Sequence, residues 1–142
     1  DADVFALAAK NGQMSVQSFF IRGGQNWGHR ALFPRHTNDV EEAQVLADVM
    51  LQFYEEVPPP PTILVDRDLP ECELIEAALS ELAGRKVRIS VPERGDRRKL
   101  MAQAQRNAVE ALERRHIPAY RAVGEALARA MGRKPRLKIG TR

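Results

Sequence analysis

Four aspartates are the candidate metal-binding residues of this chain. Asp66 and Asp68 directly follow the apolar run 62–65, and Asp1 and Asp3 stand at the N-terminus. Two-metal cleavage of a phosphodiester bond needs several carboxylates that converge at strand ends, because the attacking and leaving oxygens must both be stabilised. One acidic corner cannot hold two metal ions. We therefore expect Asp66 and Asp68 to form a turn and to cap the helix that follows.

The histidines and the cysteine do not add a second metal or nucleophile site. His29, His36 and His116 are scattered without the spacing of zinc ligands, so we interpret them as surface residues. Cys72 is the one cysteine, which excludes an intramolecular disulfide and favours a reducing cytoplasm. The acidic start of the chain is unlike a secretory signal. No apolar run reaches the roughly 18 residues that span a bilayer, so no membrane partner is expected.

Basic residues gather in the second half of the chain. Residues 1–83 carry five Lys/Arg against fourteen Asp/Glu, a balance of −9, whereas residues 84–142 carry seventeen against five, a balance of +12. This indicates contact with phosphate or an acidic partner, or simply a solvated helix face. The densest cluster before the tail begins a predicted helix, where positive charge opposes the helix dipole and so favours a binding role. Its members are Arg94, Arg97, Arg98 and Lys99.

A second candidate for DNA contact is the predicted turn at Gly23-Gly24. Glycine lets a backbone approach a phosphate closely, and the following Gln25, Asn26 and Trp27 could form hydrogen bonds or stack. A Gly-Gly hairpin turn needs no ligand to explain it, however, and Trp27 can equally be a core residue. Three arginines around the ends of the predicted strands complete this candidate set, namely Arg22, Arg30 and Arg35.

Strands come first in the chain, and helices then alternate with strands. The first third carries β-branched and aromatic residues between Asn-Gly and Gly-Gly turn signals, which predicts antiparallel strands at 4–9, 14–22 and 27–33. The apolar spacing then changes to three and four residues, which predicts helices joined by short buried strands. The predicted helices are 39–54, 71–83, 96–115 and 120–131, and the predicted strands are 62–65 and 87–91.

Local signals predict where these helices begin, end and face the core. Asn38 or Asp39 can cap the first helix. Ile117-Pro118 is expected to end the third, because proline lacks the N–H donor and clashes with the preceding turn. The apolar residues of the second helix are all expected to face inward, namely Leu74, Ile75, Ala78, Leu79 and Leu82.

The order strand-strand-strand-helix-strand-helix-strand-helix is that of a ribonuclease H-like α/β fold. Its mixed sheet has a three-stranded antiparallel meander, then helix-linked parallel strands, with helices at the C-terminal end. We place this domain at 1–116, and a C-terminal helix and basic tail at 117–142. In an active domain of this topology the first strand carries an aspartate near its middle, where this chain has Phe5-Ala6-Leu7-Ala8. We therefore assign no catalytic residue and no metal ligand.

Five motifs in order resemble the UvrC family. Residues 16–24 are similar to a strand of that family that ends in Arg-Gly-Gly, and the other motifs follow at natural spacings over roughly residues 3–132. They include an aromatic-proline strand end, a proline-rich connection into the next strand, a "G.KV" and "P.RG" pair and an "A..NA..AL" helix. These lie at 32–35, 53–61, 79–100 and 104–112.

The resemblance implies a place in nucleotide excision repair. UvrC proteins incise damaged DNA on both sides of a lesion, and this region would lie between the UvrB-binding segment and the catalytic ribonuclease H-like endonuclease. The implied partners are damaged DNA, UvrB and the UvrA–UvrB–DNA complex, reached through a cytoplasmic parent protein of the SOS response. The parent nuclease is expected to use Mg²⁺ or Mn²⁺, and this segment no cofactor. Where the next acids of the family belong, the chain has Lys138 and about Arg142.

The sequence leaves three functions open. The leading one is a noncatalytic, structural and DNA-positioning domain of UvrC. The second is a protein-interaction module of the repair complex, in which the acidic first half binds protein and the basic half is merely solvated. The third is a stand-alone metal-dependent nuclease, which the missing carboxylates disfavour. The parent is an excision endonuclease, but whether this segment is itself an enzyme stays open, since it lacks GIY-YIG and hairpin motifs.

Overall fold

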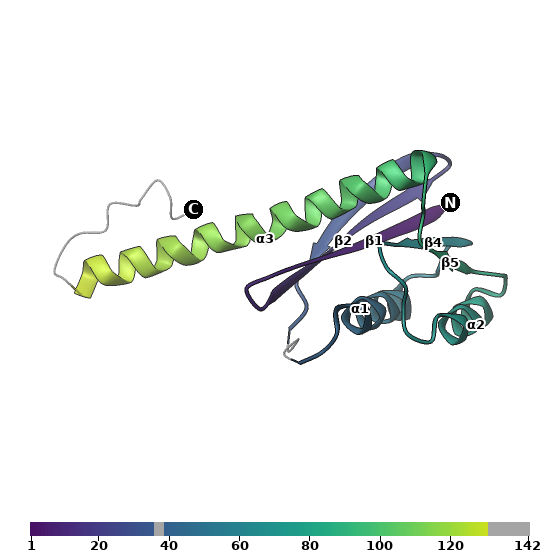
Figure 1. The fold of residues 1–142 in the computed structure, drawn as a ribbon, viewed down its shortest axis with the longest axis horizontal. Coiled ribbons are helices and arrows are strands. Elements are labelled where there is room, and N and C mark those ends of the chain that lie inside the picture. The colour runs from purple at the N-terminus through teal and green to yellow at the C-terminus, as the bar shows by residue number, and fades with distance from the viewer. Residues whose placement is uncertain (36–38, 131–142) are drawn as a thin grey trace.

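A single five-stranded mixed sheet runs through the middle of the molecule (Figure 1). The computed structural model describes residues 1–35 and 39–130, with the backbone alone for 116–129. The strand order is β3-β2-β1-β4-β5, in which β1 pairs antiparallel with β2 and parallel with β4. This confirms the predicted ribonuclease H-like α/β fold. The strands are β1 (Ala2–Lys10), β2 (Gln13–Arg22), β3 (Gln25–Leu32), β4 (Thr62–Val65) and β5 (Arg88–Ser90).

Two tight turns fix the register of the meander. The first is made by Asn11 and Gly12 with φ of 52° and 76°, and the second by Gly23 and Gly24 with φ of 59° and 77°. Positive φ at both central residues is the geometry that matches the twist of the flanking strands, and Asn and Gly adopt it readily. Both predicted hairpins are therefore confirmed.

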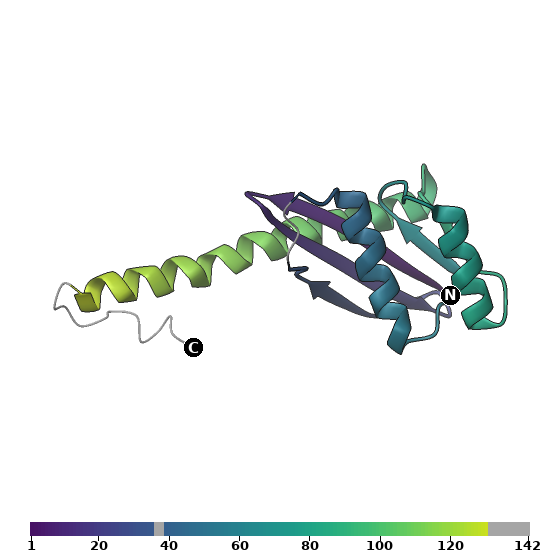
Figure 2. The same cartoon turned by 90° about the horizontal axis from the view of Figure 1, so that it is seen from below.

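Helices cover both faces of the sheet, so the domain has three layers. Helices α1 (Glu42–Glu56) and α2 (Cys72–Ala83) lie on one face, and α3 (Gly95–Ala130) crosses the other, as Figures 1 and 2 show from two directions. The α1–α2 core contains Phe5, Leu46, Met50, Ile63 and Leu79 among its buried members. The α3 core is smaller and consists of Val4, Ala6, Phe19, Leu64, Met101 and Ala104.

Strand pleating explains how one sheet supplies both cores. Successive side chains of a strand point to opposite faces. In β1, Val4 and Ala6 therefore pack under α3, whereas Phe5 and Leu7 pack under α1 and α2. Both faces of the central strands must be apolar in such an arrangement, as their sequences predicted.

Helix α3 continues where the sequence predicted a break. It runs from Gly95 to Ala130 through Ile117-Pro118, so the predicted third and fourth helices are one, and its second half extends beyond the sheet (Figure 1). Proline removes one backbone donor, but the flanking residues are rich in Ala, Arg, Glu and Leu, which favour helix strongly enough to continue it. The division of the chain at residue 116 stays a prediction.

The predicted caps of the first two helices are wrong. Helix α1 begins after Glu41 rather than at Asp39, which has a φ of 63° and therefore precedes the helix, and Asn38 is outside the described residues. Helix α2 begins after Glu71, which is left-handed with a φ of 53° and forms no side-chain cap hydrogen bond. No side-chain cap hydrogen bond is present at α2, so neither Asp66 nor Asp68 caps it. The carboxylate of Asp66 instead accepts from Leu7 and Arg67.

The inward face of α2 is narrower than predicted. Ile75 and Leu79 are buried, but Leu74 is 66% exposed and Leu82 is 63% exposed. Ala78 is exposed as well. Helix α2 lies against β5, which has only three residues and closes one edge of the sheet, so little surface is present to cover its other apolar side chains. Among the described residues, no helix is both long and apolar enough to cross a membrane.

Candidate functional site

Asp3 is fully buried in β1 and is held by two side chains from other elements. Arg22 at the end of β2 donates from Nη1 to Asp3 Oδ1 at 2.9 Å, and the Tyr54 hydroxyl of α1 donates to Oδ2 at 2.6 Å. Burial, followed by the charge of Asp3, raises the pKa of the Tyr54 hydroxyl, which therefore remains a donor. Arg22 thus balances the negative charge of the Asp3 carboxylate, and Arg22 and Tyr54 together fix its orientation.

Asp66 lies just beyond β4 and is held even more completely. Its Oδ2 accepts the backbone N–H of Leu7 at 3.0 Å and the Arg67 Nη2 at 3.0 Å, and its Oδ1 accepts the Arg67 Nε at 3.0 Å. Gln105 of α3 donates to the same Oδ2 at 3.3 Å. The side chain of Asp66 has no exposed surface. Both oxygens of this carboxylate therefore accept hydrogen bonds from donors of the protein itself.

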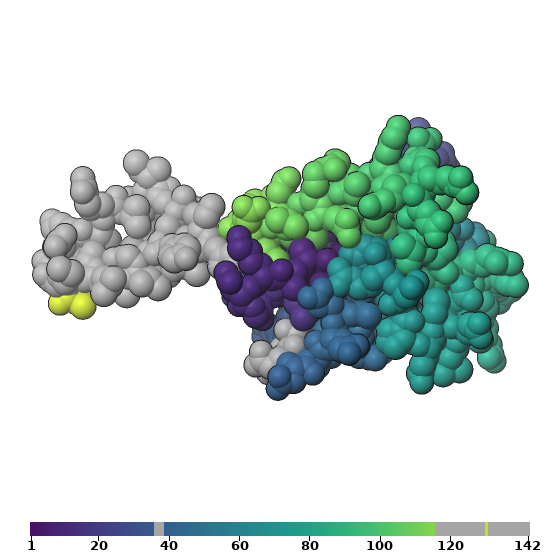
Figure 3. Space-filling model, in the orientation of Figure 1, coloured from purple at the N-terminus to yellow at the C-terminus, as the bar shows by residue number. Residues whose placement is uncertain are grey.

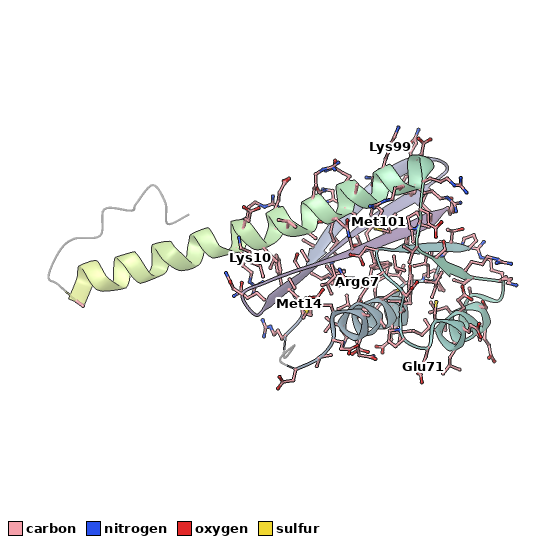
Figure 4. All side chains as sticks on the ribbon, in the orientation of Figure 1. Lys10, Met14, Arg67, Glu71, Lys99 and Met101 are labelled. Atoms are coloured by element: carbon pink, nitrogen blue, oxygen red, sulfur yellow. The ribbon has the colours of Figure 1, made fainter. Side chains whose placement is uncertain are left out.

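Arg67 links this carboxylate to the rest of the fold. Its Nη2 donates to the Leu7 carbonyl at 2.9 Å, and its Nη1 pairs with Glu42 at the start of α1. The hydrogen bonds to Asp66, as the largest cause, raise the pKa of the Arg67 guanidinium. Figure 4 shows Arg67 between the sheet and α1. The Asp66–Arg67 pair therefore connects β1, α1 and α3 and ends the β1–β4 ladder.

These two carboxylates lie at opposite ends of the β1–β4 pairing. Asp3 is opposite Ile63 near the start of the β1–β4 pairing, whereas Asp66 lies beyond its other end, so they do not converge. Each is bonded to an arginine, which supplies the positive charge that a metal ion would supply. Asp68 is exposed. In the part of the chain that the structure describes, no group of three or more His, Cys, Asp or Glu is placed to hold a metal ion.

The arginines and the tyrosine of this arrangement were not predicted from the sequence. Tyr54 and Asp3 are 51 positions apart, so their contact exists only in the folded chain. The adjacency of Arg67 to Asp66 was a usable signal, because a neighbouring arginine can neutralise a carboxylate at a strand end.

The candidate turn at Gly23-Gly24 is largely occupied by internal contacts. Arg22 donates to Asp3 and to the carbonyls of Ala2 and Ile21, so its guanidinium serves the fold. The backbone N–H of Gly23 donates to Asp1 Oδ1 at 3.0 Å. The glycines themselves are exposed, and an added Cβ would meet nothing at either position. Close approach to a ligand is sterically open there.

The basic cluster at the start of α3 lies at the same end of the sheet as this turn. Ile21 of β2 and Leu100 of α3 pack against the same apolar cluster, which brings the neighbouring turn and the helix start together. Lys99 marks this end in Figure 4. The four basic side chains are all exposed, and we call this surface the basic end, consisting of Arg94, Arg97, Arg98 and Lys99.

Arg30 and Arg35 lie elsewhere. Arg30 lines a groove of about 300 Å³ between β3 and α1, together with Glu55 and Glu56. Arg35 follows β3 and is therefore at the opposite end of the sheet from Gly23-Gly24. The structure thus brings the turn and the basic end together but separates them from these two arginines.

Other residues singled out in the sequence can also be placed. Trp27 is 74% exposed, so its interpretation as a core residue is wrong. His29 is exposed, as predicted; His36 and the side chain of His116 are outside the described residues. Cys72 is half-buried against the α1–α2 core, and burial, assisted by nearby acids such as Glu76, raises the pKa of its thiol.

Charge is divided between the two helical layers. Helices α1 and α2 together carry seven acidic residues and no Lys or Arg. Residues 94–115, which include the part of α3 that packs on the sheet, carry seven Lys/Arg and three acids. Figure 3 shows α3 along the upper side of the molecule, above the blue and teal α1–α2 layer. The sequence asymmetry therefore corresponds to two opposite faces.

The fold defines a class of protein, a ribonuclease H-like domain, in which the carboxylates of Asp3 and Asp66 are each bonded to an arginine. Comparison with known families agrees. The family model described as "UvrC Ribonuclease H-like domain" matches residues 1–115. The chain belongs to this family.

Individual relatives agree with the family match. Over 115 residues the chain is 67% identical to UvrABC system protein C of Novosphingobium aromaticivorans and 62% identical to that of Sphingopyxis alaskensis. It is 50% identical to that of Hyphomonas neptunium. Each alignment covers 81% of this chain but only 18–19% of the relative, so the chain spans about a fifth of the length of these curated relatives.

Proposed function

We propose that this chain is a noncatalytic ribonuclease H-like domain of a UvrC subunit, and that it helps to position damaged DNA in nucleotide excision repair. The observation that carries the noncatalytic assignment is that Asp3 and Asp66 are each bonded to an arginine and do not converge. The relatives named UvrABC system protein C support the repair role. Incision, and the Mg²⁺ or Mn²⁺ it needs, would belong to another part of the parent protein.

The basic end is the surface best suited to contact DNA. Its four cations are exposed, and the Gly23-Gly24 turn beside them presents a backbone without obstructing side chains. Cations at a helix N-terminus oppose the helix dipole, so their presence there fits a role in binding phosphate better than one in stability. UvrB and the UvrA–UvrB–DNA complex would be met through the parent protein, in the cytoplasm.

Salt-dependent binding of the 142-residue chain to a labelled duplex tests the DNA contact. The logarithm of the binding constant should fall linearly with the logarithm of salt concentration, by about 0.9 for each phosphate contacted. The variant Arg97→Gln/Arg98→Gln/Lys99→Gln should flatten this slope. A control with the same charge change, Lys10→Gln/Arg30→Gln/Arg35→Gln, should retain it. Equal flattening in both variants would show that only net charge matters and would refute a contact at the basic end.

An incision assay separately tests the noncatalytic assignment. Damaged duplex is incubated with the chain and Mg²⁺ or Mn²⁺, and we expect no product above the background of a protein-free sample. Specific cutting that is lost in Asp66→Asn would overturn the assignment, because it would show that this carboxylate holds a metal rather than only Arg67.

A second candidate function, protein interaction, is favoured by an exposed apolar stripe on α2. Leu74, Ala78 and Leu82 are exposed at a spacing of four residues, which puts them on one side of the helix. Acids and no Lys or Arg accompany them in α2. Exposed apolar surface with an acidic rim fits a partner helix that carries apolar residues between Lys and Arg.

Binding to purified UvrB, alone and in the UvrA–UvrB–DNA complex, tests this second candidate. The variant Leu74→Ser/Leu82→Ser should weaken binding at least tenfold, because two apolar contacts are lost, each of which contributes about 1 kcal/mol or more. Val109→Ser is the control, since Val109 is 46% exposed but lies on α3. Unchanged binding in the α2 variant would refute the role of the stripe.

A further inference from the structure

Strand β3 is an edge strand, and among the described residues no helix lies across it on the face of the sheet that α3 covers at β1 and β2. Helix α3 packs across β1 and β2, while β3 carries mostly exposed residues. Directly opposed residues of antiparallel strands share a face. His29 is opposite Phe19, which packs under α3. His29 therefore lies on the same face of the sheet as α3, one strand further towards the edge. Beside α3, this side of β3 forms an open surface.

Aromatic side chains occur along this open side. Trp27 lies between Asn26, which is opposite Ile21 on the α3 side, and Gly28, which is opposite Phe20 on the α1 side, so it is the extra residue of a bulge at the edge of the sheet. Trp27 stands at the register shift opposite Phe20 and Ile21, and it is 74% exposed. From Trp27 through His29 to Phe33 the strand and the residue after it extend for about 20 Å. Trp27 and His29 are exposed and Phe33 is half-buried, so the edge strand presents aromatic rings along its length.

Arginines of α3 form the wall of the same surface near the end of β3. Ala31, Phe33, Ala111, Arg114 and Arg115 line a groove of about 330 Å³. The Arg115 guanidinium lies over the Phe33 ring at 4.3 Å from its centroid, a cation–π contact that leaves the cation exposed. Arg114 and Glu110 are 4.0 Å apart, a loose surface pair that an anion can displace.

We propose that this surface, the β3–α3 groove (Trp27, His29, Ala31, Phe33, Arg114 and Arg115), binds a single-stranded stretch of DNA. Aromatic rings stack on unpaired bases, and arginines pair with the phosphates between them. Paired bases of a duplex present no free faces to such rings. This surface runs along β3 from Trp27, close to the Gly23-Gly24 turn and the basic end, to Phe33 and Arg115 at the far end of the strand. The domain would therefore hold duplex at the basic end and an unpaired segment along the groove that leads away from it.

The inference rests on the proposed DNA-positioning role but concerns a different surface and a different form of DNA. Trp27 is the single tryptophan of the chain, which makes it a built-in probe. Titration with a short oligothymidylate should quench Trp27 fluorescence, because a stacked base deactivates the excited indole. The same titration with an abasic oligonucleotide of equal length should bind by charge alone and quench little.

Two variants and one control separate the contributions. Arg114→Gln/Arg115→Gln should weaken binding of the oligothymidylate about tenfold, and Phe33→Leu should weaken it several-fold. Arg30→Gln is the control for position, because Arg30 is an exposed arginine of β3 that lines the α1 side of the sheet. Its affinity should equal that of the parent. The substituted arginines are exposed, so circular dichroism should show an unchanged fold.

The result that would overturn the inference is an oligothymidylate that neither quenches Trp27 nor loses affinity in Arg114→Gln/Arg115→Gln. Equal competition by polyglutamate would also overturn it, since the groove would then select only negative charge. If duplex binding at the basic end persists in that case, the proposed function survives and the groove assignment alone fails. If both forms of DNA fail to bind at low salt, the DNA-positioning function fails with it.

Discussion

Replacement of Asp66 by alanine should destabilise the domain by about 2–4 kcal/mol. The change leaves the buried N–H of Leu7 without its acceptor, which costs about 1–3 kcal/mol. It also removes the two hydrogen bonds from Arg67 and the one from Gln105. The Arg67 side chain is 28% exposed and can turn towards water, so the loss is smaller than the 3–5 kcal/mol of a fully buried pair.

Urea denaturation followed by circular dichroism measures this effect. With a slope of about 2 kcal/mol/M, the midpoint of Asp66→Ala should fall by about 1–2 M. Asp66→Asn keeps the shape and one acceptor oxygen, so it should lose roughly half as much. Asp68→Ala is the matched control, because Asp68 is exposed, and its midpoint should move by less than about 0.3 M.

Two results would contradict this role of Asp66. If Asp66→Ala were as stable as Asp68→Ala, the Asp66–Arg67 pair would not hold β1, α1 and α3 together. If millimolar Mg²⁺ stabilised the parent protein but not Asp66→Ala, Asp66 would be a metal ligand instead. We expect neither variant nor parent to gain stability from Mg²⁺.

Three further outcomes follow from burial and pKa. The pKa of Tyr54 is raised in the folded state, so the free energy of unfolding should be highest below the ordinary tyrosine pKa of about 10 and should fall as pH rises above it. Urea titrations at alkaline pH should show a smaller fall in Tyr54→Phe than in the parent protein. The raised pKa of Cys72 should make iodoacetamide labelling reach half its maximal rate at higher pH in the folded chain than in urea. Leu79→Ala should cost about 2–4 kcal/mol by urea denaturation, whereas Leu74→Ala should cost under about 0.5, and equal losses would contradict the described orientation of α2.

Local sequence signals were sufficient to predict most of the helices and strands of the fold. The turns at Asn11-Gly12 and Gly23-Gly24 require positive φ, which few residues adopt, so they could be located from residue type alone. The bounds of β4 were predicted without error, because prolines precede an unbroken apolar run there. Strand order then followed from the succession of elements and the right-handedness of crossovers.

The errors have a common physical origin in long-range contacts. The helical spacing of Leu74, Leu79 and Leu82 predicted that all three face the core. Whether the sheet is large enough to cover them depends, however, on the length of β5. Asp66 seemed suited to cap α2 from its place in the chain, yet its acceptors face Leu7 and Gln105, which are 59 and 39 positions away. No pattern within a helix or turn carries such information.

The division of charge between the two faces of the sheet makes the described part of the domain an electric dipole. A net charge of +3 alone would attract DNA weakly and without preference for orientation. With acids concentrated in α1 and α2 and cations along α3, the field of a nucleic acid exerts a torque that turns the acidic face away before contact. A larger fraction of encounters with DNA would therefore lead to binding than for a domain of the same net charge without this division. Added salt would slow association because it screens both the attraction and the alignment.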